Sequence, residues 1–397
     1  MSFPRVCVCA SLLFLLACPA GAADDFAASL RLRGGYDTNP QFSNGAGIGG
    51  SAFVATDLAL AAGTKEEGYS FGAAAEASRT QYFNPLAPPA SNGKVILRGL
   101  LGDDQAGVSA VTTLSDISTY NLRATDAIQA VKGEAKFGSI KLFATVEGAH
   151  SSLNQTNAFF QDFLPNPHVY LRGTVIPGIA FARDKFEIGA SVNLSVRRYA
   201  QELDDFGYRR DNERIQPFVF ARYSDDNIML AGSISHLRGT WHDVDFSNVS
   251  AYLYDASLTW RLKPFTIDLT ASRRANETTF PISPITLDRM LTGKISWQAA
   301  PNLTLNAAAG YVSTQYLDSP FSAQTVTYGV GLSHDFGHGY AFGFDVTRAR
   351  GTLISGEKAS AIIVMSSLTK RFTPFAGAAK PVPKVGGKAT KVAADGG

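Results

Sequence analysis

The sequence predicts an all-β protein: a transmembrane antiparallel up-and-down β-barrel of about eighteen strands, with about sixteen as the alternative, since bacterial barrels have even numbers. Three observations lead to this fold class. The chain opens with an export segment, apolar and polar residues alternate along most of its length, and the connections between the alternating runs are short and long in turn.

The N-terminal segment reads MSFPRVCVCASLLFLLACPAGAADDF. Arg5 supplies the positive start, residues 6–17 form an apolar run too short to span a bilayer, and Ala20–Ala22 provides a cleavage site of small residues. Residues 1–22 are therefore predicted to be a secretory signal peptide. A lipoprotein signal is the alternative, because residues 15–18 (LLAC) loosely resemble a lipobox.

Composition agrees with export to a membrane. All 3 cysteines lie in the signal segment, so the mature chain is predicted to have no disulfide framework. Charged residues make up 18% of the chain and the net charge is +2, which gives no electrostatic footprint for nucleic acid. Beyond the signal, no apolar run reaches the ~18 residues of a membrane helix. A mature chain that spans a membrane must therefore do so with strands.

The alternation has a period of two, as in the segments 185–200, 265–274 and 302–311. Successive side chains of a strand point to opposite faces, so each segment has one apolar and one polar face. The apolar face of the first segment comprises Phe186, Ile188, Ala190, Val192, Leu194 and Val196. Runs of this length exceed the usual ~5–6 residues of a globular strand and suit the ~9–11 of a tilted membrane strand.

The connections alternate in length. The short ones lie near residues 63–67, 102–105, 136–139, 182–185, 224–227, 262–264, 299–302 and 334–339. The long ones are 38–49, 83–92, 116–126, 150–166, 200–211, 240–248, 275–285, 316–322 and 351–358. Short periplasmic turns alternating with longer outer loops are typical of a membrane barrel. This pattern predicts a barrel over 23–372 with both ends in the periplasm.

Aromatic residues are predicted to form two interfacial girdles. The girdle at the short turns comprises Tyr69, Phe186, Trp260, Phe265, Trp297 and Phe342, and the one at the long loops Tyr36, Tyr82, Tyr199, Trp241, Tyr311 and Tyr316. Two prolines oppose the pattern: Pro177 falls inside the strand expected at 166–182, and Pro217 inside that at 212–224, where each removes a ladder donor. Bulges or displaced strand ends would reconcile them.

The last expected strand ends on Phe372, and residues 373–397 are rich in Pro, Gly, Ala and Lys. This composition predicts a disordered, basic periplasmic tail.

The sequence contains no convincing enzyme or cofactor site. Gly45, Gly47 and Gly50 have the GxGxxG spacing, but a nucleotide-binding turn needs a buried strand before it and a helix after it. Here a polar loop precedes and an alternating strand follows, so these are loop and strand-entry glycines. His242–Asp243 lies in an expected outer loop without a nucleophile, and the pair His334 and His338 is a weak metal candidate. We expect no catalytic residues, metal or cofactor, and no enzyme activity.

The polar face carries the functional prediction. The residues expected to line the pore are Arg31, Arg33, Asp57, Glu76, Arg98, Arg172, Glu187, Arg197, Arg222, Asp255, Arg261, Asp268, Arg274 and Asp345. Arg or Lys on a lipid face costs ~2–4 kcal/mol at the midplane, so these groups should face water or one another. They serve either as wall-stiffening salt bridges or as solute contacts, and a basic excess would favour anionic solutes or acidic sugars.

The first strand ends in the stretch Gly35, Tyr36, Asp37, Thr38, Asn39 and Pro40. This GYDTNP motif, followed by a Gly/Ser-rich loop and a second strand, resembles a family of outer-membrane β-barrel porins, some of them encoded with exopolysaccharide export genes. The resemblance extends in layout over roughly 23–372, whereas the tail after Phe372 departs from it.

The resemblance implies a channel in the Gram-negative outer membrane that passes an exported exopolysaccharide or small hydrophilic solutes. The expected partners are outer-membrane lipid, lipopolysaccharide and components of polysaccharide export. The alternatives are a barrel hydrolase and a structural or adhesive barrel without an open pore.

Overall fold

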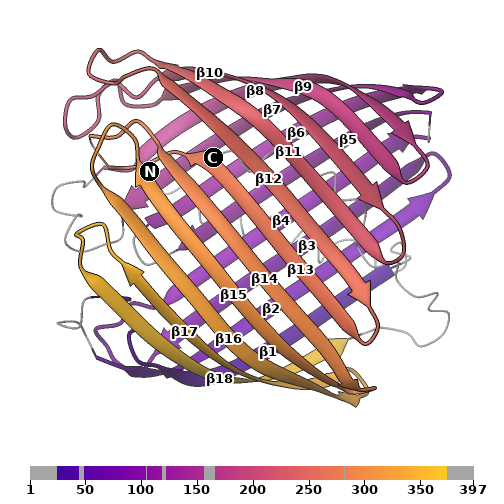
Figure 1. Ribbon diagram of the computed structural model, residues 1–397, viewed down its shortest axis with the longest axis vertical. Helices are drawn as coiled ribbons and strands as arrows, with labels where there is room; N and C mark the ends of the chain where they lie inside the picture. Colours follow the sequence, from indigo (N-terminus) through magenta and orange to yellow (C-terminus); the bar gives the residue numbers. More distant parts are fainter. Residues whose placement is uncertain are drawn as a thin grey trace.

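The computed structural model describes residues 25–372 except 44–48, 104, 119–121, 156–165 and 281. These residues form one 18-stranded antiparallel sheet in which each strand pairs with its neighbours in sequence. The first strand pairs with both the second and the last, so the sheet closes on itself, as Figure 1 shows. The predicted fold class and the larger of the two predicted strand numbers are confirmed.

The strands are β1 (Asp25–Asp37), β2 (Ser51–Glu66), β3 (Tyr69–Tyr82), β4 (Ala90–Gly102), β5 (Ala106–Ser118), β6 (Leu122–Phe137), β7 (Ile140–Gln155), β8 (His168–Arg183), β9 (Phe186–Tyr199), β10 (Asn212–Ser224), β11 (Ile228–Trp241), β12 (Val249–Leu262), β13 (Phe265–Asn276), β14 (Thr286–Ala300), β15 (Leu303–Tyr316), β16 (Ser322–Gly337), β17 (Tyr340–Thr352) and β18 (Lys358–Phe372). No helix among these described parts is long and apolar enough to cross a membrane.

The two faces of the wall differ in what they expose. Along β7, Leu142 and Val146 are 46% and 57% exposed, whereas Glu147 and Ser151 are 4% and 2% exposed. Apolar side chains that remain exposed on one face belong to the lipid side of a membrane barrel, and polar side chains buried on the other face lie inside it. The register of paired strands extends this assignment around the barrel.

The strands are longer than the alternation suggests at two outer loops. The predicted loop 116–126 is wrong, because β5 runs to Ser118 and β6 begins at Leu122. The predicted loop 150–166 is also too long, because β7 continues to Gln155. Near the rim the contrast is lost, because Asp116 and Arg123 face outward while Ile117 and Leu153 face inward, so the strands extend beyond the regular alternation.

Both prolines lie inside strands, at the places where the sequence put them. Pro177 lies opposite Ala144 of β7, and the β8–β9 ladder is interrupted beside it. Pro217 lies opposite Val192 of β9, and the β10–β11 ladder is interrupted in the same way. Each proline therefore interrupts the hydrogen bonding between its strand and one of the two neighbouring strands.

The predicted aromatic girdles hold at one end only. The six aromatics near the short turns share the outward parity with the exposed apolar residues, as Tyr69, Trp260 and Trp297 illustrate. At the long-loop end the prediction is wrong for Tyr82, Tyr199, Trp241 and Tyr316, which face inward. Proximity to a strand end does not determine parity, and these rings pack inside the mouth of the barrel.

Three predictions lie wholly or partly outside the described residues: the signal peptide 1–22, the tail 373–397, and the loop glycines Gly45 and Gly47. Gly50 is described and directly precedes β2, as expected of a strand-entry glycine.

Candidate functional site

The structure places the predicted pore-lining residues on the inward face of the wall. It pairs several of them: Arg33 lies 2.6 Å and Arg31 3.9 Å from Asp57, and Arg274 lies 2.6 Å from Asp255. Register also places Arg172 directly opposite Arg197 and Glu187 directly opposite Arg222. No other predicted lining residue lies directly opposite Glu76, Arg98, Arg261 or Asp345. Their role as the lining of a conducting pore stays a prediction.

The connection between β13 and β14 folds into one side of the mouth of the barrel; we call its described residues, 277–280 and 282–285, the strap. Glu277 at its start lies 2.8 Å from Arg197 Nε of β9 and accepts a 2.5 Å hydrogen bond from Arg214 Nη2 of β10. Tyr199 donates its hydroxyl to the same carboxylate at 3.0 Å. Strands β11 and β12 lie between β13 and this site in the sheet, so the strap reaches inward past them.

A third arginine holds the backbone of the strap. Arg210, in the β9–β10 loop, donates to the carbonyl oxygens of Thr278, Phe280 and Ser283 at 2.9–3.2 Å. The guanidinium is itself paired with Asp204 at 2.8 Å. Because Arg presents five donors in a fixed planar group, one side chain can bond three carbonyls of the same loop.

The other end of the strap is apolar. Ile285 is completely buried in a cluster with Leu237, Trp241, Phe246, Val249, Ala251, Leu253, Ala275 and Leu287. Trp241 and Phe246 also stack beneath Arg214 and Arg210, with cation–ring distances of 5.1 and 5.4 Å. Loops β9–β10, β11–β12 and β13–β14 thus form one packed unit that narrows this side of the mouth.

Burial and charge oppose each other at Glu277. Burial alone raises the pKa of its carboxyl group, but Arg214 and Arg197 outweigh it and hold the pKa below its ordinary value. The group is therefore ionised at neutral pH. The sequence prediction included Arg197 and missed Arg214, although Arg214 shares the face of Arg222 in β10. Nothing in the sequence signals that Glu277 folds inward.

Nearer the short turns, the inward wall carries an aromatic strip, defined as Phe143, Phe218 and Phe220. The rings of Phe143 and Phe220 lie 6.0 Å apart, and those of Phe218 and Phe220 6.2 Å apart. Glycines on the intervening strands make room: a Cβ on Gly178 would lie 2.2 Å from the ring of Phe143, and one on Gly189 2.5 Å from the ring of Phe220.

Charged groups flank the aromatic strip. Lys132 lies over Phe143 and Arg222 over Phe220, each 5.5 Å from the ring centre. Lys132 is paired with Glu134 at 2.6 Å, and the neighbouring ion pair Lys141–Glu187 spans 2.7 Å. The sequence prediction considered only charged residues on this face, so it missed the phenylalanines, although Phe218 and Phe220 share the parity of Arg222.

His242 and Asp243, the candidate pair of the outer loop, make separate contacts at the rim. His242 lies 3.7 Å from Glu213 at the exposed rim, while Asp243 accepts hydrogen bonds from the backbone of Arg209 and Asp245. Among the described residues no group of three or more His, Cys, Asp or Glu side chains is placed to hold a metal ion.

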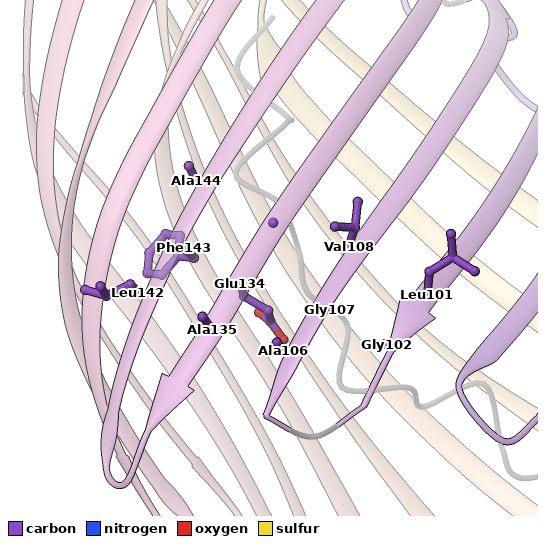
Figure 2. A pocket seen from close by; sticks show the side chains of 11 residues that line it. Leu101, Gly102, Ala106, Gly107, Val108, Glu134, Ala135, Leu142, Phe143 and Ala144 are labelled. Atoms are coloured by element: carbon purple, nitrogen blue, oxygen red, sulfur yellow. The ribbon is translucent and has the colours of Figure 1, made fainter.

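A shallow depression lies at the short-turn end of β4 to β7, as Figure 2 shows. Its rim is formed by Leu101, Val108 and Leu142, which are 46–66% exposed on the outward face. The small residues Gly133 and Ala135 form its floor. Glu134 and Phe143, which register places on the inward face, also line it, so the depression is not confined to the outward face.

The GYDTNP motif joins the first strand to the last. Thr38 donates its backbone N–H to Ile362 of β18 and accepts the N–H of Ile362 on its hydroxyl, at 3.0 and 2.8 Å. Asn39 donates its side-chain amide to the carbonyl of Ser360, and Asp37 accepts the N–H of Asn39. At Gly35 a Cβ would lie 2.3 Å from the carbonyl oxygen of Val364, so this position needs glycine. The motif therefore helps to hold β1 against β18 where the barrel closes.

A closed barrel of antiparallel strands with an outward apolar face and an inward polar face has the architecture of an outer-membrane β-barrel. Residues 184–371 match the family model described as "Putative beta-barrel porin 2", which confirms the predicted resemblance to β-barrel porins. The match begins after the GYDTNP motif.

Solved structures with a similar arrangement include the outer membrane protein opdK from Pseudomonas aeruginosa, at 10% identity and a TM-score of 0.45, covering 88% of this chain and 100% of that chain. They also include a BenF-like porin from Pseudomonas fluorescens Pf-5, at 10% identity and a TM-score of 0.48, covering 88% and 98%. Pseudomonas aeruginosa OccK2 (OpdF) in complex with glucuronate has 11% identity and a TM-score of 0.48, covering 88% and 99%. No curated protein matches the sequence.

Proposed function

We propose that the protein is a passive channel for hydroxyl-rich hydrophilic solutes, with saccharides, including an exported exopolysaccharide, as its passengers. The observation that carries this proposal is the aromatic strip on the inward wall. An aromatic ring offers an apolar platform to the C–H face of a sugar ring, while flanking charged groups bond its hydroxyls.

The ion pairs of the wall favour the same class of solute. Where Lys132 pairs with Glu134 and Lys141 with Glu187, the wall presents donors and acceptors side by side without a strong net field. Such a surface suits hydroxyl groups, which both donate and accept, better than it suits a simple ion. The predicted preference for acidic sugars becomes one outcome to be compared with neutral ones.

Planar-bilayer recordings test the proposal. The full chain should conduct ions, and neutral and uronate-containing oligosaccharides added to one side should block the current in a concentration-dependent way. Phe220→Ala should weaken the block roughly threefold to tenfold. We assign the contact between a sugar ring and Phe220 the energy of an aromatic pair, about 0.5–1.5 kcal/mol. Phe181→Ala, which removes an outward-facing ring from β8, is the matched control.

Two results would contradict the proposal. A folded barrel that conducts no ions would instead be a structural or adhesive barrel. Conductance that no saccharide blocks would leave a channel but exclude sugars as its passengers. The same proposal includes export by cleavage after residue 22, which N-terminal sequencing of the outer-membrane protein tests. It also includes delivery of the polymer by export components, which copurification from cell envelopes tests.

A further inference from the structure

Near the long-loop end, the outward face of β11 to β14 carries a basic patch, defined as Arg238, Arg273 and Arg289. Register places all three on the same face as the exposed apolar residues Leu230, Leu269 and Leu291. Arg238 and Arg289 each lie three residues from the outer end of their strand, as does Arg273. At ~3.4 Å per residue the patch lies about 10 Å along the strands from the rim.

Two of these arginines oppose each other. Arg273 of β13 and Arg289 of β14 are directly paired across neighbouring strands. Like charges in such a pair are destabilising, and the outward residues of β11 to β15 include no Asp or Glu that could compensate them. Arg273 donates one Nη1 hydrogen to the carbonyl of Tyr252 at 2.8 Å, but its buried Nε has no hydrogen-bond partner.

Polar and aromatic groups surround the patch. Tyr254 lies directly opposite Arg273, and the ring of Tyr252 packs 4.7 Å from that of His236. Such rings suit the boundary between lipid chains and headgroups. Two guanidinium groups side by side at that depth fit a doubly charged anion, because Arg binds phosphate with two parallel N–H···O bonds.

We propose that the basic patch binds the phosphate groups of a phosphorylated glycolipid of the outer leaflet, which is the chemistry of lipopolysaccharide. The long-loop end faces the cell surface in barrels of this type, and that leaflet is the anionic layer at this height. The ligand neutralises the Arg273–Arg289 repulsion. This interaction is independent of what passes through the barrel.

Native mass spectrometry of the full chain, with diphosphorylated lipid A and with chemically dephosphorylated lipid A as probes, tests the proposal. Wild type should bind the phosphorylated lipid at least tenfold more tightly than the dephosphorylated one. The double variant Arg273→Gln/Arg289→Gln should lose about tenfold in that affinity, equivalent to ~1.4 kcal/mol. Arg183→Gln, an exposed arginine at the short-turn end, should bind as wild type does.

A second measurement separates binding from misfolding. In phosphate-free detergent the double variant should unfold at a temperature no lower than that of wild type, because the substitution removes a like-charge pair. Lipid A should then raise the unfolding temperature of wild type more than that of the variant. Equal affinity of variant and wild type, equal binding of dephosphorylated lipid, or equal thermal protection would each overturn the assignment.

Discussion

Glu277→Gln is the substitution that most directly tests how the strap is held. Glutamine keeps the size and shape of the side chain and removes its charge. In the folded protein the carboxylate lies 2.8 Å from Arg197 and 2.5 Å from Arg214, and its side chain is only 2% exposed. The substitution therefore leaves two buried guanidinium groups without their shared counter-ion.

The size of the effect follows from this burial. Removing one partner of a buried ion pair costs about 3–5 kcal/mol, because the remaining charge is left uncompensated. If that cost applies to the local equilibrium between a strap bound to β9 and β10 and a released strap, the population of the released state rises by a factor of ~100 to ~4,000. The exposed pair Glu213–Arg198 at the rim should contribute only about 0–1 kcal/mol, so Glu213→Gln is the matched control.

Hydrogen exchange and single-channel recording measure this population. The backbone amides of residues 278–280, 282, 283 and 285 should exchange about two orders of magnitude faster in Glu277→Gln than in wild type, while those of the barrel strands remain protected. The current should show more frequent transitions between conductance levels. Unchanged exchange in the strap together with unchanged current would refute the idea that this carboxylate holds it, and the same acceleration in Glu213→Gln would show that the effect is not local.

Three further outcomes are expected. Because the pKa of Glu277 is lowered, its ionised form holds the strap at every pH above the ordinary value of 4.5 and releases it as the pH falls through the lowered pKa. The protection factors of the strap amides, which are corrected for the intrinsic pH dependence of exchange, should therefore be constant from pH 7 to 5 and fall in more acidic buffer; constant protection throughout would contradict a role for this carboxylate. Gly178→Ala should displace the ring of Phe143 and weaken saccharide block several-fold in bilayers, whereas Gly148→Ala, whose Cβ meets nothing within 4 Å, should not. Gly35→Ala should lower the temperature at which the band of the folded barrel disappears on gels. Gly34→Ala, whose Cβ would have its nearest contact at 3.9 Å, should match wild type. If Gly35→Ala also matched wild type, the contact between β1 and β18 would tolerate a side chain at this position.

The barrel was predictable because every strand meets the same requirement. Each strand must present apolar groups to lipid and polar groups to the interior, so the alternation in a stretch such as residues 185–200 is repeated along the chain. Parity also identified which face carries Arg197 and Glu187. It could not distinguish inward from outward for Tyr82 or Trp241 when only their closeness to a loop was considered.

The mouth was not predictable, because its contacts join residues that no local rule connects. Glu277 and Arg197 are 80 positions apart, and the carboxylate belongs to a loop whose composition is that of an ordinary surface connection. The aromatic strip was within reach, since Phe218 and Phe220 stand on the polar face of β10. The prediction considered only charged residues at inward positions, so it did not include these phenylalanines.

The two ends of the strap are held by different forces, and this difference determines how the mouth responds. Ile285 is fixed by apolar burial, which depends little on salt or acidity. Glu277 is fixed by charge, and its hold disappears when one carboxylate is protonated or replaced. A perturbation of charge therefore frees the Glu277 side chain first, while Ile285 stays buried and Arg210 still holds the carbonyls of the strap. Because Asn276 pairs with Thr286, Glu277 and Ile285 lie close together at the base of the loop, and truncating Ile285 should loosen the apolar contact while the ion pair still holds this base.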